Sequence, residues 1–282
     1  MKPGPYPFTF SRKTGEDFSS YVSDESGLPM VRLNRRRPPV YNPVTICQYG
    51  LDRGRHEEEI LLKAADWLMR HAEKSPGGHT VWHYSFDFPL YGMKSPWISA
   101  MAQGQAISLL VRAHALTGHS RYSETAESAL DVLFTPVEQG GTLRHFSDGH
   151  AWLEEYPLPG RMTGVLNGCL FALIGIYEFA RSRNSHTAQK LFENVMMGLY
   201  AHLKDFDTGF WTYYDLSCPP RIASVAYHRN HFRLLDILWI YTGDQRLHEY
   251  STRWKKYAGS PLCRIRRYIY RARYALHRET PR

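Results

Sequence analysis

The chain has 282 residues, 43% of them hydrophobic, which is enough for one large domain or two small ones. Its net charge of +8 favours an acidic partner, but the basic residues concentrate in 32–39 and 263–278, and no zinc-finger or RRM-like signature predicts nucleic-acid binding. The N-terminus has no apolar signal segment, and no run of about 18 apolar residues predicts a membrane span. The scattered Cys47, Cys169, Cys218 and Cys263 suit neither a disulfide framework nor a zinc site, so we expect a cytoplasmic protein.

Helices are expected to dominate the fold. Residues 61–73 read as an outer, amphipathic helix of an incomplete unit. Three complete units follow, beginning at Gly104, Gly168 and Phe232, each start 64 residues after the one before. In each, an almost wholly apolar helix is followed by a short polar turn and an amphipathic helix. Such a period indicates a repeat architecture, and stacked pairs of this kind predict an all-α fold, an incomplete (α/α) toroid with the apolar helices around a central cleft.

Short hairpins are predicted between the helix pairs. Residues 79–92, 140–157 and 207–218 alternate aromatic and polar residues around Gly or Asp turns. Each delivers its end to the start of an inner helix, so we expect these ends at the cleft rim, where sites usually lie. The 19 Tyr, 13 Phe and 7 Trp fit either an aromatic core or a carbohydrate site, whose flat rings pack on sugars.

Chemically active side chains gather at three of these junctions. They are Glu154, Glu155 and Tyr156; Tyr213, Tyr214 and Asp215; and Tyr227, His228 and His231. For any single tyrosine, packing is the simpler interpretation, and the occurrence of tyrosines at three equivalent junctions weakens it without removing it. The i, i+3 spacing of the histidines suits a metal, but no third ligand is evident. Because neighbours on a strand point to opposite faces, only one of the two glutamates can join a distant acid such as Asp215 in a hydrolase site.

Six blocks of the sequence resemble one family. They are "YNPVTICQYGL" (41–51), "PWISAMAQGQAISLLVRAHALTG" (96–118), "WLEEYP" (152–157), "VLNGCLFALIGIYEF" (165–179), "YDL" (214–216) and "YHRNH" (227–231). In this order they resemble the C-terminal domain of D-glucuronyl C5-epimerases, which act on heparosan-type chains. The resemblance implies an (α/α) toroid and an isomerase that converts D-glucuronate to L-iduronate in an acidic glycan. A polysaccharide lyase and a non-catalytic glycan-binding protein remain the alternatives.

The resemblance also implies site residues. Tyr156, Tyr214 and Tyr227, with Glu155, match the catalytic motifs. The substrate-binding residues expected beside them are Asn167, Gln103, Trp152, His228 and His231. No metal and no cofactor is expected. Two tyrosines on facing rims would exchange the C5 proton, and Tyr227 with Glu155 and His231 would hold the uronate carboxylate. Ser217 and Ser224 stand where family members acting on heparosan carry arginines, which leaves the glycan open.

The ends of the chain are predicted to differ from its middle. We expect an N-terminal extension over 1–40, the toroid domain over 41–260 and a basic tail over 261–282. In the tail, Ile265, Tyr268, Ile269, Ala272 and Leu276 form one apolar stripe of a helix, with arginines around it. Such a helix either lies on an anionic membrane surface or packs on the toroid as a closing helix.

Overall fold

A computed structural model of the chain describes residues 3–10 and 21–279, with side chains as far as residue 272. Its helices are α1 (Pro43–Arg53), α2 (Glu58–Arg70), α3 (Ala100–Thr117), α4 (Ser120–Phe134), α5 (Leu166–Arg183), α6 (His186–His202), α7 (Val225–Thr242), α8 (Gln245–Gly259) and α9 (Pro261–Glu279). Two short 3₁₀ helices, η3 (Val137–Gln139) and η4 (Leu203–Phe206), follow α4 and α6. Among the described residues, no helix combines the length and apolar character that crossing a bilayer requires.

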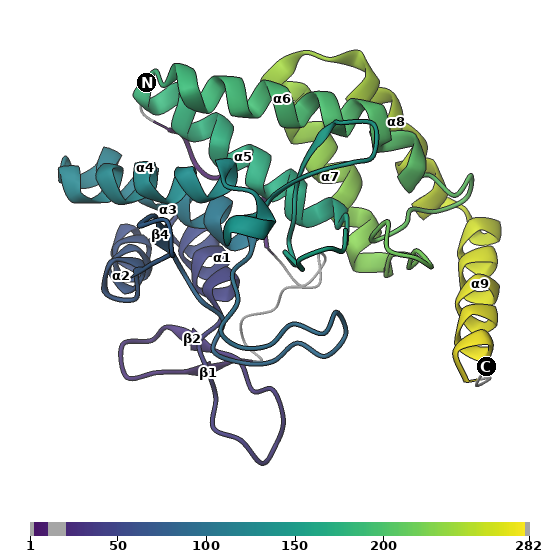
Figure 1. Ribbon diagram of the computed structural model, residues 1–282, viewed down its shortest axis with the longest axis horizontal. Helices are drawn as coiled ribbons and strands as arrows, with labels where there is room; N and C mark the ends of the chain where they lie inside the picture. Colours follow the sequence, from purple (N-terminus) through teal and green to yellow (C-terminus); the bar gives the residue numbers. More distant parts are fainter. Residues whose placement is uncertain (1–2, 11–20, 280–282) are drawn as a thin grey trace.

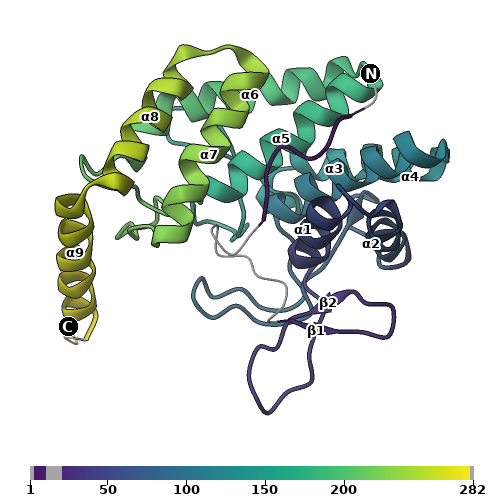
Figure 2. The ribbon, with the colours of Figure 1, turned by 180° about the vertical axis from the view of Figure 1, so that it is seen from behind.

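The first eight helices form four pairs (Figures 1 and 2). The inner helices α1, α3, α5 and α7 contact one another in that order, and each contacts its outer partner α2, α4, α6 or α8. The predicted toroid of apolar and amphipathic helices is therefore confirmed. The predicted outer helix over 61–73 is α2, and the structure adds its inner partner, α1.

A repeated turn joins the helices of the three later pairs. The inner helices α3, α5 and α7 end at Gly118, Asn184 and Gly243, all in the left-handed conformation, with φ of 73°, 51° and 71°. Glycine and asparagine tolerate this conformation best, and it stops a helix cleanly. Elsewhere small residues decide the packing. A side chain at Gly104 or Gly175 would collide with the facing backbone of the other helix, so these glycines let α3 and α5 lie close together.

The N-terminal segment 3–10 is part of the core. Phe8 and Phe10 are buried, and the Phe8 ring packs edge-on against Phe171 of α5, with ring centroids 5.1 Å apart. The Phe10 backbone N–H donates to the Asp52 carboxylate of α1 over 2.9 Å. The Arg233 guanidinium of α7 lies 4.3 Å from the Phe8 ring centroid. This part of the predicted extension thus ties α1, α5 and α7 together.

A buried ion pair joins the C-terminal halves of two inner helices. Arg112 of α3 donates to both oxygens of Glu178 of α5, over 2.7 and 2.8 Å. Tyr241, near the end of α7, donates to the same carboxylate over 3.2 Å, and Arg112 stacks on the Tyr6 ring. Bidentate geometry and extra donors are what a charge pair needs when it is removed from water.

Among the described residues, the strands form three small antiparallel hairpins. They pair β1 (Val22–Ser23) with β2 (Pro29–Met30), β3 (Glu73–Lys74) with β4 (Thr80–Val81), and β5 (Leu143–His145) with β6 (Ala151–Leu153). In the last, Leu143 lies opposite Leu153 and His145 opposite Ala151. Isolated bridges, Tyr84 to Trp97 and Asp207 to Thr212, mark the other predicted hairpin segments. The strand β6 leads directly into Glu154 and Glu155.

Candidate active site

An aromatic cavity of about 200 Å³ opens among the starts of the inner helices and the segments before them. Its aromatic walls come mainly from the segment after β4 and from the junction after β6: Tyr84, Phe86, Phe88, Trp97 and Tyr156. Polar lining residues come from the start of α1, from the junction after β6, and from α5 and α7: Asn42, Thr45, Gln48, Glu155, Asn167, Tyr227 and Asn230. None of the described lining residues is a lysine or an arginine.

The adjacent glutamates after β6 point in opposite directions, as predicted. The Glu154 carboxylate accepts hydrogen bonds from the backbone N–H groups of Thr163 and Gly164, at 2.9 and 3.1 Å, and from the Thr163 hydroxyl. It therefore holds the loop that leads into α5. Glu155 turns to the cavity instead, so one glutamate shapes the site and the other lines it.

Glu155 is a buried acid that binds its proton more tightly than an ordinary glutamate does. Burial raises its pKa from 4.5 to about 7, against the hydrogen bonds of Tyr156, Tyr214 and Asn167, which lower it. Asn167 donates to its Oε2 over 3.3 Å. Gly168 makes this position accessible, because a Cβ there would lie 2.5 Å from both the Cβ and the Oε2 of Glu155. A carboxyl with a pKa near neutrality can both take and return a proton.

The three predicted tyrosines come together at this glutamate. The rings of Tyr214 and Tyr227 lie 4.6 Å apart, and Tyr156 stacks on Tyr91 at 4.2 Å. Hydrogen bonding by the hydroxyls of Tyr156 and Tyr214 lowers the pKa of Glu155, and the Tyr214 hydroxyl acts in the same way on Tyr156. Burial, followed by the charge of Glu155, raises the pKa of both tyrosines well above its usual value. Both are therefore neutral phenols in this arrangement.

Asp215, the acid considered for a hydrolase, already has a full set of partners. Its carboxylate accepts from the Tyr91 hydroxyl at 2.7 Å, the Ser217 hydroxyl at 2.6 Å and Arg221 Nε at 2.6 Å. The Arg221 guanidinium lies 4.0 Å from the Tyr91 ring centroid and 5.7 Å from that of Tyr214. Asp215 and Arg221 thus brace the loop that carries Tyr214.

The start of α7 supplies the opposite wall of the site. Ser224 caps this helix, and its hydroxyl accepts from the Tyr227 backbone N–H over 3.1 Å. Tyr227 is 40% exposed and stands at the mouth. One turn further, Asn230 is buried, and its Oδ1 has no hydrogen-bond partner among the described residues. The Oδ1 of Asn167 is unpartnered in the same sense. Both amide oxygens are ready to accept from a ligand hydroxyl.

Four residues predicted to bind substrate lie elsewhere. Gln103 donates to the backbone oxygens of Thr80 and Ala129. Trp152 stacks on Phe206 in the core. The remaining two are His228 and His231, which share the Thr212 hydroxyl at 2.8 and 3.0 Å. All four side chains are buried, and none lines the cavity.

The two histidines are also poor charge carriers. Burial lowers the pKa of His228 to about 4 and that of His231 well below its usual value. They are neutral near pH 7, and their hydrogen bonds to Thr212 and to the Trp254 backbone oxygen lie inside the fold.

Sequence reasoning missed several residues of the site. Asn230, Gln48 and Tyr84 line the cavity, and Tyr91 and Arg221 brace the tyrosines. Asn230 and Gln48 lie in the segments 227–231 and 41–51, which resemble the family. The resemblance of a segment does not tell which of its helical residues face the cavity. Nothing in the spacing of Tyr91 or Arg221 connects them with Asp215.

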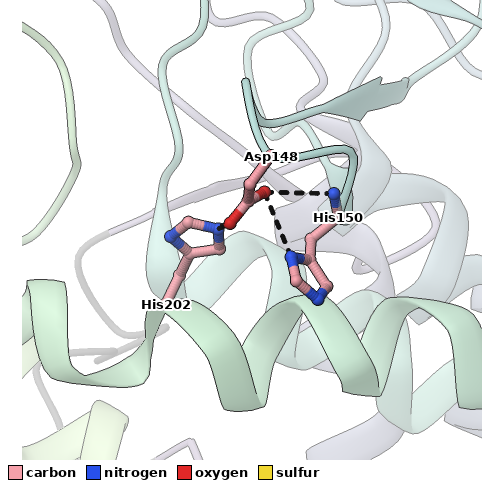
Figure 3. A group of neighbouring side chains, drawn as sticks. All are labelled: Asp148, His150 and His202. Carbon is pink, nitrogen blue, oxygen red and sulfur yellow. Dashed lines mark hydrogen bonds and ion pairs between the residues drawn. The ribbon is translucent and has the colours of Figure 1, made fainter.

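One cluster outside the cavity has the donor set of a metal site (Figure 3). Atoms of Asp148, His150 and His202 lie within 4.8 Å of one another. Asp148 Oδ1 lies 3.1 Å from His150 Nδ1, and Oδ2 lies 3.1 Å from His202 Nε2, while Asp205 takes the other ring nitrogen of His202. These pairs connect the β5–β6 turn to the end of α6, and this structural role explains the cluster without a metal ion.

A larger groove of about 720 Å³ lies at the other end of α5, against α6 and the end of α7. Tyr177, Arg181, Glu193 and Tyr241 are among its lining residues. It holds none of the junction residues, so the small aromatic cavity remains the candidate active site.

Comparison with known proteins gives consistent matches. The family model described as "D-glucuronyl C5-epimerase C-terminus" matches residues 76–256. A D-glucuronyl C5-epimerase of Caenorhabditis elegans is 31% identical over 233 residues, which cover 76% of this chain and 37% of the nematode protein. An uncharacterized protein of Methanocaldococcus jannaschii is 30% identical over 220 residues, which cover 76% of this chain and 70% of the archaeal protein.

A solved structure supports the fold. The unsaturated glucuronyl hydrolase of Bacillus sp. GL1 matches with a TM-score of 0.50 and 16% identity, over 76% of this chain and 61% of the hydrolase. The chain thus spans little more than a third of the nematode enzyme and less than two thirds of the hydrolase. The family match covers more than half of the chain. The chain therefore belongs to the family of D-glucuronyl C5-epimerase C-terminal domains.

Proposed function

We propose that this protein is a carbohydrate-acting isomerase that exchanges the C5 proton of D-glucuronate residues in an acidic glycan, giving L-iduronate. The observation that carries the proposal is the arrangement at Glu155: one buried carboxyl with a pKa of about 7, a value that hydrogen bonding by the hydroxyls of Tyr156 and Tyr214 lowers against the effect of burial. Membership of the epimerase family and the aromatic walls of the cavity support it.

The reaction needs a base on one face of the sugar ring and a proton donor on the other. The C5 proton lies next to the uronate carboxylate, so its removal gives an enediolate-like intermediate. A free tyrosine is a weak base, and burial weakens it further here. The phenol must therefore lose its own proton at the moment its oxygen takes the one from C5.

Glu155 can accept this phenol proton and later return a proton, and in this sense it acts as a proton store. Ionised Glu155 takes the hydroxyl proton of one tyrosine, Tyr156 or Tyr214, while that oxygen takes the C5 proton. The other tyrosine gives its proton to the opposite face of C5 and recovers one from Glu155. The carboxyl ends the cycle ionised, so no atom or charge is left over. The negative charge of Glu155 moves to the intermediate and back, and the charge of the site is constant throughout.

The remaining polar groups of the cavity hold the sugar. The buried amide oxygens of Asn167 and Asn230 accept its hydroxyl groups, and Tyr227 at the mouth binds the carboxylate. Ring faces such as those of Trp97 and Phe88 pack on the sugar. Entry of the sugar replaces the direct contact between the Tyr156 and Tyr214 hydroxyls, and each keeps its bond to Glu155.

The test is isotope exchange with unsulfated glucuronate polymers in D₂O. Deuterium at C5 is expected, and Tyr214→Phe and Glu155→Gln should each lower its rate by about 10²- to 10⁴-fold, the usual contribution of a positioned acid or base. Tyr213→Phe is the matched control, because this neighbouring hydroxyl lies beside that of Tyr270 rather than Glu155. An unsaturated, ultraviolet-absorbing product would identify a lyase instead. Neither product, with binding retained, would leave a glycan-binding protein.

A further inference from the structure

The helix α9 lies outside the order of helix pairs. It follows α8 after a single residue, and both ribbon views show it at the edge of the molecule, away from the inner helices (Figures 1 and 2). Its sequence is the basic, amphipathic tail. The question left open by the sequence is whether its apolar stripe packs on the toroid.

One side of α9 contacts the body. Arg267 is almost fully buried, donates from Nε to the Ala223 backbone oxygen over 2.9 Å, and lies 5.5 Å from the Trp211 ring centroid. Tyr270 is half-buried, and its hydroxyl lies 3.3 Å from that of Tyr213. These contacts fix which way the helix is turned.

The apolar stripe lies on the opposite side. Leu262 is 72% exposed, Ile265 56%, Tyr268 74% and Ile269 46%. At about 100° of rotation per residue, the middle of this stripe falls roughly opposite Arg267 and Tyr270. Ala272 is exposed too, and Leu276 lies outside the residues whose side chains are described. The stripe therefore faces away from the toroid and does not close it.

Arginines border the stripe on both sides. On the same helical wheel, Arg266 lies along one edge and Arg264 with Arg271 along the other, and all three are exposed. No aspartate or glutamate occurs between Pro261 and Ala272. An apolar face with cations at both of its edges is the arrangement in which long basic side chains reach the headgroups while aliphatic side chains enter the acyl boundary.

We propose that α9 binds the surface of an anionic lipid bilayer, lying in the interface with Leu262, Ile265 and Ile269 toward the acyl chains. The positions of the arginines favour a lipid bilayer over an apolar groove on another protein as the binding partner. Cations along both edges of the stripe match a continuous negative surface. The contacts of Arg267 and Tyr270 join α9 to the segment 211–223, which carries Tyr214. Binding therefore brings this edge of the molecule, beside the cavity, to the membrane.

The experiment is sedimentation of the full chain with vesicles of phosphatidylcholine, with and without phosphatidylglycerol. The double variant Ile265→Ser, Ile269→Ser changes only exposed side chains, so the fold is expected to stay intact, as circular dichroism would verify. The matched control is Ile240→Ser on α7, an isoleucine 73% exposed at a distance from the arginines of α9. A second variant, Arg266→Gln with Arg271→Gln, removes charge and keeps the stripe.

Binding to phosphatidylglycerol vesicles at low salt is expected, with little binding to phosphatidylcholine alone. Both double variants should weaken it by about tenfold or more, since the acyl contact and the charge attraction act together. The Ile240→Ser control should bind as the unaltered chain does. The proposal is overturned if the full chain ignores anionic vesicles at low salt, or if the serine variant binds equally well. It is also overturned if light scattering shows that the serine variant only converts a dimer to monomers.

Discussion

Replacement of Glu155 by glutamine tests the buried acid directly, without any substrate. In the folded chain this carboxyl has a pKa of about 7, against 4.5 for an ordinary glutamate. Between these values the folded state keeps the proton and the unfolded state has lost it. The resulting stabilisation is fully present below pH 4.5 and disappears as the pH rises through 7. Glutamine has the same shape and no proton to lose, so this part of the pH dependence should vanish.

The size of the effect follows from the two pKa values. A difference of one unit corresponds to about 1.4 kcal/mol, so between pH 5 and pH 8 the native chain should lose about 2.5 kcal/mol more free energy of unfolding than the Glu155→Gln variant. Urea unfolding at pH 5, 6, 7 and 8, at constant ionic strength, measures this difference. All other titrating groups are common to both chains and largely cancel.

A second variant tests the direction in which the pKa of Glu155 changes. The Tyr214 hydroxyl lowers the pKa of Glu155 by hydrogen bonding, so Tyr214→Phe should move the loss of stability to higher pH. Parallel curves for the native chain and Glu155→Gln would mean that Glu155 titrates as an exposed acid does. The proton-store mechanism would then have no basis.

Three further predictions concern the frame around the site. Phe8→Ala should lower the free energy of unfolding by about 3–5 kcal/mol, because it leaves a cavity in the core, and a loss below about 1 kcal/mol in urea unfolding would show that the N-terminal segment is not packed there. Glu178→Leu should destabilise the chain by about 3–5 kcal/mol by stranding a buried arginine, whereas combining it with Arg112→Met should recover most of the loss; equal losses in both would contradict a coupled pair. Gly168→Ala should favour the helix but displace Glu155, so C5 exchange should fall while the thermal midpoint stays within a few degrees. Unchanged exchange in that variant would show that Glu155 does not need this space.

The repeat of helices is predictable from sequence because burial imposes it on composition. A helix enclosed on all sides must be apolar all round, and its partner must be amphipathic, so three copies of that pattern identify the architecture. The N-terminal segment carries no such mark. The sequence predicts residues 3–10 only as part of an N-terminal extension, and the structure shows Phe8 and Phe10 buried against Phe171 of α5. Segments without periodicity give no sign of what they pack against.

The candidate site shows a sharper limit, at the start of α7. The sequence has two pairs at i, i+3 spacing there, Tyr227 with Asn230 and His228 with His231. One residue of difference rotates a side chain by about 100°, so the two pairs face different neighbours. The first pair lines the cavity, and the second bonds to Thr212 behind it. Histidine is a common catalytic residue, and this made His228 and His231 candidates for the site. Which pair lines the cavity depends on the face of α7 that packs against it, and the spacing of residues alone does not identify that face.

Ser217 and Ser224 stand at the two positions where the resemblance to the family implies arginines. The Ser217 hydroxyl donates a hydrogen bond to Asp215, and the Ser224 hydroxyl caps α7 at Tyr227. Both serines therefore have structural roles that need a hydroxyl group and no cation. The positive charge near Tyr214 is instead that of Arg221, which is already paired with Asp215. A cavity with no cation among its described lining residues gains little from sulfate groups on the substrate. We therefore expect unsulfated glucuronate polymers to exchange at C5 faster than N-sulfated ones. Faster exchange of the sulfated polymer would show that a cation reaches the sugar from outside the cavity described here.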